Sequence, residues 1–337
     1  MSSLKSSAQS SAQSSAQSSV DRLPHRRALA VFMVVMALLP PVLPTKYYVS
    51  ILVIAGIFVM LALGLNLVMG YTGQVSLGHA GFYGLGAYAS GVLTTKYGFN
   101  PWFAMLVALF ISAIASGLIG AAALRLQGYY LSMATLGFGI ILYILFVELA
   151  WLTGGPSGLT GIPEFRIGTF KIASDIPYYY LVWTIVGAML LFAFHLVDSR
   201  VGRSLRAIQG DETAAALVGV NTWATKVQVF VVGACMASVA GSLYAHYVTV
   251  LTPETFGFML SIEIVVMVIV GGSGSIWGGL LGAVLLTLLP EYLRVMKDYD
   301  VLIYGAIVIL VVMFLPRGIG GGIEHRLRQR MLARRSG

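Results

Sequence analysis

The chain has 337 residues, of which 58% are hydrophobic and only 10% are charged. Soluble globular proteins carry about 25% charged residues, so this composition excludes a soluble fold and indicates an integral membrane protein. The net charge of +8 does not indicate nucleic-acid binding, because the basic residues gather near the chain ends and in short loops, as the positive-inside rule expects. The single cysteine lies in an apolar run, so neither an intrachain disulfide nor a Cys/His metal site is predicted.

The first 27 residues have the composition of a disordered tail. Residues 6–17 repeat the sequence SSAQ, a low-complexity pattern that cannot bury apolar surface. Arg22, Arg26 and Arg27 then precede the first apolar run. A basic flank in this place favours a cytoplasmic N-terminus, so residues 1–27 are predicted to be a cytoplasmic tail.

Residues 28–316 carry the hydropathy pattern of an all-α polytopic bundle. A membrane-spanning helix needs about 20 apolar residues, and the pattern predicts about 8–10 such helices. The predicted segments are residues 28–44, 48–69, 75–95, 101–124, 129–152, 177–197, 227–250, 258–272, 276–293 and 301–316. The third is rich in glycine and the eighth is short, so both are predicted to be broken or re-entrant.

The distribution of basic residues predicts the orientation of these segments. With ten spans, 15 of the 21 Lys and Arg residues fall on one side, which favours a cytoplasmic location for both termini. Residues 317–337 then form a basic cytoplasmic tail. Two long loops remain, with 153–176 predicted outside and 198–226 inside. The chain leaves no room for a soluble catalytic domain.

The loop 198–226 is the most informative part of the sequence. Residues 206–217 include a run of three alanines and predict a short amphipathic helix at the membrane surface. Gly219 is placed to end that helix in the left-handed conformation, and Asn221 with Thr222 can cap the next helix. Two interpretations stay open at this point: a solvated connector, or a docking helix that fits a groove of a soluble partner.

The same loop resembles a known motif. Glu212-Thr213-Ala214-Ala215 followed by Gly219 resembles the EAA-type coupling segment of ABC importer permeases. The longer stretch 206–246 is similar to the LivM-type permeases of branched-chain amino-acid uptake systems. The resemblance implies an ATPase-coupling role for six residues. These are Arg206, Asp211, Glu212, Ala214, Ala215 and Gly219.

Two further segments agree with this resemblance. Residues 64–90 match every fixed position of the family pattern GxxGQxSLGHxxFxGxGAY, and residues 271–286 (GGSGSIWGGLLGAVLL) are also similar. The resemblance covers about residues 45–320. It implies a permease subunit that pairs with a second homologous permease in the bacterial inner membrane, together with two cytoplasmic ATP-binding subunits and a periplasmic solute-binding protein.

The resemblance also implies a substrate and a source of energy. Branched-chain amino acids are the expected solute, with urea, short amides or another small solute as alternatives. The chain has no GxxxxGK[ST] loop, so it is not expected to bind ATP itself. ATP and Mg are therefore expected on the partner ATPases, and no cofactor is expected on this chain.

The Gly-rich segment 70–91 is a candidate for the translocation path. Glycines destabilise a helix, and irregular backbone at membrane depth is tolerated where it is buried or lines a cavity. The break at 271–275 has a similar character, and ionisable groups inside a membrane are functional candidates. The candidate path or gating residues are Asn66, Gly73, Gln74, Ser76, Gly78, His79, Glu263, Gly272 and Gly274. Tight packing against a second permease is the alternative role for this segment.

Two other classes of protein compete with the importer interpretation. Composition and span number alone also fit a stand-alone secondary transporter or channel, and the coupling-like loop is what separates the two. A membrane-embedded enzyme needs clustered His, Asp or Glu residues such as an HExxH motif, which the sequence lacks. No catalytic residue and no metal ligand are therefore predicted.

Overall fold

A computed structural model describes residues 28–43, 45–126, 128–167, 170–172 and 174–293, together with eight scattered positions between 303 and 318. The predicted tail 1–27 lies outside these residues, as do nearly all of the predicted tail 317–337 and much of the predicted segment 301–316. The chain divides into two compact units, residues 1–49 and 50–337.

The first unit contains a short apolar helix, Ala28–Leu38. A single 3-10 turn, η1 (Pro40–Val42), follows it. The predicted span 28–44 is therefore wrong in length. Proline has no backbone N–H, so Pro40 and Pro41 cannot donate the next hydrogen bonds of the helix, which explains why it ends at Leu38.

The second unit is all-α, apart from short strand pairs. Six helices of the described residues are long and apolar enough to cross a membrane, which confirms the predicted polytopic helical fold. They are α2 (Lys46–Thr72, which begins in the first unit), α4 (Pro101–Ala123), α5 (Tyr129–Glu148), α7 (Asp175–Asp198), α10 (Thr222–Val248) and α12 (Ile276–Leu293). The shorter helices are α3 (His79–Thr95), α6 (Ala150–Thr153), α8 (Arg200–Gly210), α9 (Glu212–Leu217) and α11 (Phe258–Gly271).

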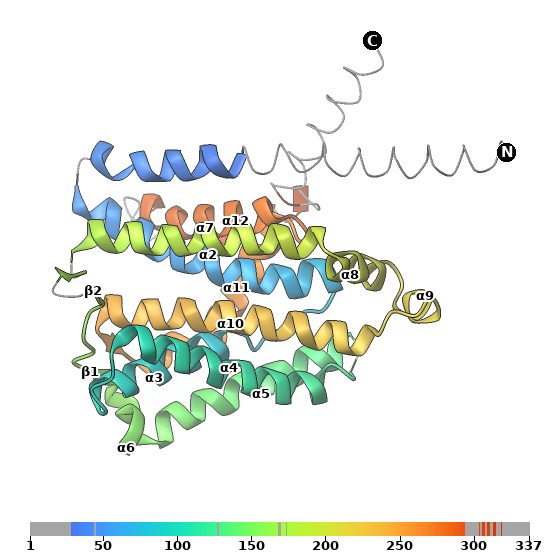
Figure 1. Cartoon of the computed structure of the whole chain (residues 1–337), viewed down its shortest axis with the longest axis horizontal. Helices are drawn as coiled ribbons and strands as arrows, with labels where there is room; N and C mark the ends of the chain where they lie inside the picture. Colours follow the sequence, from blue (N-terminus) through green and yellow to red (C-terminus); the bar gives the residue numbers. More distant parts are fainter. Residues whose placement is uncertain are drawn as a thin grey trace, which may run out of the picture. The chain divides into compact units, whose positions relative to one another are not determined.

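The two ends of this unit differ in structure. Helices α8 and α9 lie beyond the ends of the long helices on one side, and β1, β2 and α6 lie at the opposite end (Figure 1). At that opposite end, β1 (Leu159–Thr160) pairs antiparallel with β4 (Val250–Leu251), and β2 (Arg166–Ile167) pairs with β3 (Phe170–Lys171). The predicted outer loop 153–176 is therefore partly ordered by strand pairing.

A buried histidine also fixes this loop. The ring of His246, on α10, bonds through Nε2 to the Ser90 hydroxyl at 2.8 Å and through Nδ1 to the Pro163 carbonyl oxygen at 2.6 Å. The ring packs on Phe165 with 4.6 Å between centroids. Since both ring nitrogens have partners, His246 holds the loop against α3 and α10.

Small residues bring α10 close to its neighbours. A Cβ atom on Gly241 would lie 2.0 Å from the Tyr83 carbonyl oxygen, and one on Gly86 would lie 2.2 Å from that of Ser238. Only glycine permits such close backbone approach. Gly241 of α10 and Gly86 of α3 therefore serve helix packing.

The eighth predicted span is a broken helix. Helix α11 has 14 residues, or about 21 Å at 1.5 Å per residue, less than the ~30 Å hydrocarbon core. It is preceded by β4 and the 3-10 turn η3 (Pro253–Phe256). Phe256 packs against Tyr83 and Tyr88 of α3, with ring centroids 5.1 and 5.6 Å apart. The chain therefore reaches the middle of α3 without forming α-helix, and α11 begins directly after it.

The third predicted span is shortened in a similar way. The predicted span begins at residue 75, but α3 begins at His79 and residues 73–78 form a loop. Gly73 has φ of +70° and follows the end of α2. Hydropathy alone predicts a first helical turn over these residues, but their polar side chains and glycines favour a loop.

Candidate functional site

Helix α8 is amphipathic and begins at a well-formed cap. The Ser199 hydroxyl accepts from the backbone N–H groups of Val201 and Gly202 at 3.1 and 3.4 Å, the usual role of a serine N-cap. Leu205 and Ile208 are buried along one face. The opposite face exposes Arg200, Arg203 and Arg206, so the predicted coupling residue Arg206 is available to a partner.

The predicted continuous helix 206–217 is wrong, because Asp211 interrupts it. Asp211 has extended backbone geometry between α8 and α9. Its Oδ1 accepts from the N–H groups of Thr213 at 2.8 Å and Ala214 at 3.0 Å. A capping carboxylate of this kind starts a new helix and also favours its positive end. Asp211 therefore shapes the segment by starting α9.

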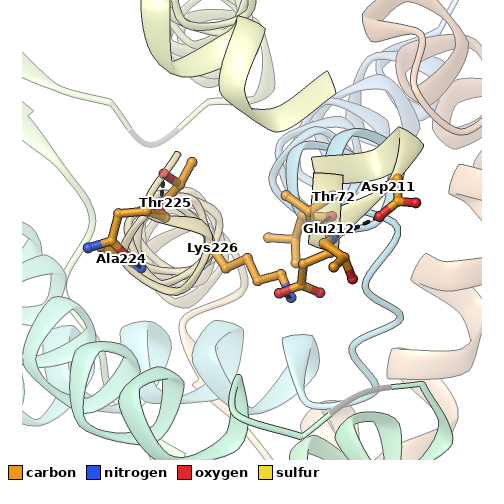
Figure 2. A network of polar contacts seen from close by, with 9 residues as sticks. Thr72, Asp211, Glu212, Ala224, Thr225 and Lys226 are labelled. Carbon is orange, nitrogen blue, oxygen red and sulfur yellow. Dashed lines mark hydrogen bonds and ion pairs between the residues drawn. The ribbon is translucent and has the colours of Figure 1, made fainter. Parts of the chain in front are cut away.

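Glu212 forms an ion pair that the sequence analysis did not identify. Its carboxylate contacts the ammonium of Lys226, which lies on α10. Figure 2 shows the Lys226 side chain extending from α10 toward Glu212. The side chain of Lys226 is 4% exposed and that of Glu212 is 35% exposed. The pair therefore fastens α9 to α10, and the sequence around Lys226 carries no signal of this partner.

The carboxyl end of α9 has the geometry predicted for Gly219. Gly219 has φ of +86°. Its N–H donates to the Ala216 carbonyl at 3.0 Å, and that of Val220 donates to the Ala215 carbonyl at 3.1 Å, which together form a Schellman motif. Asn221 then caps α10 through its Oδ1, which accepts from the Ala224 N–H at 3.0 Å.

The tip of α9 exposes apolar residues that the sequence analysis missed. Leu217 is 84% exposed and Val218 is 78% exposed. Ala214 is also exposed, whereas Ala215 is buried and anchors the helix. Apolar residues directly before a helix-ending glycine, outside any hydropathy span, were the signal available in the sequence. These exposed apolar groups lie outside the long helices that the membrane would cover.

Asn66 and the break after α11 are brought together by the fold. The Asn66 amide, which is buried on α2, donates through Nδ2 to the Ser275 carbonyl at 2.7 Å. Its Oδ1 accepts from the Gly274 N–H at 2.9 Å. Gly272 and Gly274 have φ of +111° and +82°, which glycine adopts readily. Asn66 therefore holds the turn between α11 and α12.

Three predicted path residues share an unusual feature. Gln74 Oε1, Ser76 Oγ and His79 Nε2 are buried, and none of these atoms has a hydrogen-bond partner within the described part of the chain. An unpaired buried polar atom costs about 1–3 kcal/mol, so such atoms seldom persist without a role. They lie within six residues of each other, in the loop 73–78 and at the start of α3.

The remaining predicted residues differ in their surroundings. A Cβ on Gly78 would lie 2.4 Å from the Thr135 carbonyl oxygen, whereas one on Gly73 would meet no atom within 4 Å. Gly78 therefore serves close packing on α5, and Gly73 serves the turn. Glu263 is half-buried on α11, and no hydrogen bond or ion pair among the described residues joins it to Asn66 or Gly274.

No group of three or more His, Cys, Asp or Glu side chains in the described ranges could hold a metal ion. The arrangement instead combines a helical membrane bundle, a surface helix pair with an apolar tip and a glycine-containing break. These features define the class of protein as a multi-pass helical membrane protein.

Comparison with known proteins identifies the family. Residues 47–313 match the family described as the permease component of branched-chain amino acid transport systems. The chain therefore belongs to this family of transport permeases, which are not enzymes, and the resemblance noted from the sequence is confirmed.

Individual relatives agree with this assignment. The high-affinity branched-chain amino acid transport system permease protein LivM of Salmonella typhimurium is 33% identical, over 85% of this chain and 73% of its own length. LivH of the same organism is 28% identical over 79% of this chain and 92% of its own length. The autoinducer 2 import system permease protein LsrC of Shigella flexneri is 25% identical over 92% of both chains. No solved structure matches the chain.

Proposed function

We propose that this chain forms, with a second homologous permease, the translocation path of an ABC importer for branched-chain amino acids. A periplasmic binding protein delivers the solute, and two ATP-binding subunits supply the energy. The chain itself binds no cofactor, since ATP and Mg are held by the ATPases. The importer resides in the bacterial inner membrane, with both termini of this chain in the cytoplasm.

The observation that carries this proposal is the exposed tip of α9. Leu217 and Val218 are both exposed, and α9 lies at the same end of the long helices as α8 (Figure 1), whose arginines are also exposed. A face rich in arginine is poorly suited to the hydrocarbon core, so this end belongs in water. A short helix with an apolar tip fits a groove in a soluble partner. The ATP-binding subunit is the partner that an importer requires on this side.

The second part of the proposal concerns the path. Gln74, Ser76 and His79 line or gate it, because their unpaired polar atoms offer hydrogen bonds to water or to a polar solute at membrane depth. Tight packing of this segment against the second permease is the alternative role. Exchange of His79 for Gln separates these roles, since a path residue alters solute uptake while subunit assembly stays intact.

Tagged protein purified in mild detergent tests the docking surface directly. The pair of substitutions Leu217→Ser and Val218→Ser is expected to remove the ATPase from the purified complex while the permease keeps its gel-filtration profile. The matched control, Leu217→Met with Val218→Ile, keeps the surface apolar and is expected to retain the ATPase. Full ATPase recovery with the serine variant would contradict the proposed docking surface.

Uptake into proteoliposomes tests which solute the importer transports. Labelled leucine is expected to enter in an ATP-dependent manner when the binding protein is present, and unlabelled isoleucine and valine are expected to compete. The relative LsrC is named for autoinducer 2 import, so permeases of related sequence carry different solutes. ATP-driven uptake of urea or a short amide without leucine uptake would replace the proposed solute. Uptake driven by an ion gradient without any ATPase would identify a secondary transporter.

A further inference from the structure

We propose that the carboxyl end of α2 links α8 to the break between α11 and α12, with Gln209 and Asn66 as the two positioning residues. This inference rests on the proposed function, since it describes how movement at the ATPase-docking helices reaches the membrane path. Neither residue touches the solute in this account. Each holds one backbone element in place relative to another.

The first contact joins α8 to α2. The Nε2 group of Gln209 donates to the Gly70 carbonyl oxygen at 2.7 Å, across 139 residues of sequence. Helix α2 ends at Thr72, so Gly70 lies in its last turn, where backbone carbonyls have no partner within the helix. The amide of Gln209 therefore supplies a hydrogen bond that the helix cannot supply itself. Gln209 is otherwise on the exposed side of α8.

The second contact joins α2 to the break. A Cβ atom on Gly70 would lie 2.2 Å from the Gly274 nitrogen, so the two backbones touch. One turn earlier, Asn66 bonds Gly274 at 2.9 Å and Ser275 at 2.7 Å. Residues 66 and 70 are four apart and share one helix face. The last two turns of α2 therefore hold the turn after α11 and, through Gly70, the end of α8.

The break is the place where such a link can act. Gly272 and Gly274 adopt positive φ angles there, and glycine can change between backbone regions at little steric cost. The loop that follows α2 carries the unpaired polar atoms of Gln74 and Ser76. A movement of α8, passed to α2 through Gly70, would therefore act both on the break and on the loop 73–78.

The test uses the complete importer in proteoliposomes and measures solute transported per ATP hydrolysed. Gln209→Met keeps the length of the side chain and removes the donor. It is expected to lower this ratio about three- to tenfold, the scale of one hydrogen bond, while ATPase recovery and hydrolysis rate stay unchanged. Gln209→Lys retains a donor and is expected to stay within about twofold of the original chain, since the bond to Gly70 is preserved.

One control and one double variant make the result specific. Gln228→Met makes the same chemical change at another exposed glutamine, on α10, whose amide has no hydrogen-bond partner among the described residues, and it is expected to leave the ratio unchanged. Asn66→Asp removes the donor to Ser275. If both residues serve one link, the double variant with Gln209→Met should lower the ratio less than the product of the two single effects.

The outcomes separate this inference from the proposed function. If the original chain shows ATP-driven uptake and Gln209→Met keeps the full ratio, the link is wrong and the importer stands. If Gln209→Lys is impaired as strongly as Gln209→Met, a donor to Gly70 is not what matters, and the link is again wrong. If the original chain neither retains ATPases nor takes up solute with ATP, the proposed function itself fails.

Discussion

The ion pair joins Glu212 to Lys226, and removal of one partner should affect the stability of α9 very differently from removal of the other. Glu212→Gln leaves the Lys226 ammonium in a position where its side chain is 4% exposed, without a counter-charge. Lys226→Met removes the buried charge and leaves a carboxylate that is 35% exposed and can be hydrated. The glutamate substitution is therefore expected to be the more damaging one, although it alters the more exposed residue.

The magnitude follows from the burial of the two groups. Breaking a fully buried pair costs about 3–5 kcal/mol, whereas exposed pairs contribute about 0.2–1 kcal/mol. With one buried and one half-exposed partner, Glu212→Gln is expected to cost about 1–3 kcal/mol, and Lys226→Met less than about 1 kcal/mol. The double variant removes both charges, so it should be more stable than Glu212→Gln alone.

Hydrogen exchange of the backbone amides in α9 measures this locally. Because about 1.4 kcal/mol corresponds to a factor of ten, Glu212→Gln should speed exchange in residues 212–217 by roughly 5- to 150-fold. Exchange in the middle of α10 serves as the internal control and should stay slow. Equal acceleration by both single variants, or no acceleration by Glu212→Gln, would refute the reasoning that the pair fastens α9 to α10.

Three further substitutions test other parts of the account. Gly219→Ala should lower α9 stability by about 1 kcal/mol because its φ of +86° is unfavourable for a residue with a Cβ, measured by the same exchange experiment. Asn66→Leu should destabilise the protein by about 2–4 kcal/mol in thermal unfolding, because it leaves the Gly274 N–H and the Ser275 carbonyl without the hydrogen bonds that Asn66 makes. An unchanged midpoint would contradict the role of Asn66 in holding the turn. His79→Gln should alter uptake without loss of subunits, and unchanged transport would remove His79 from the path.

The long helices and the end of α9 could be predicted because their causes are local. Hydropathy alone located the spans that became α4, α5 and α7, and glycine with a following asparagine marked the end of α9 and the start of α10. Local chemistry also explains Asp211, since its capping side chain was visible in the sequence. The sequence nevertheless predicts a continuous helix through Asp211, because the alanine run that follows it favours helix.

The features that were missed depend on contacts between distant residues. No sequence pattern near Lys226 predicts its ion pair with Glu212. None near Gln209 predicts its hydrogen bond to Gly70. The shortness of α11, in contrast, is predicted by the sequence, because the predicted span 258–272 nearly coincides with Phe258–Gly271. The packing of Phe256 against α3 explains why the helix begins only there.

ATP-dependent uptake of labelled leucine by proteoliposomes tests the central claim most directly. The vesicles should contain this chain, its homologous permease, the ATP-binding subunits and the solute-binding protein. The account predicts leucine accumulation that requires ATP and the binding protein and that is lost when Leu217 and Val218 are both changed to serine. Accumulation that persists without ATP-binding subunits would contradict the assignment of this chain as the permease of an ABC importer.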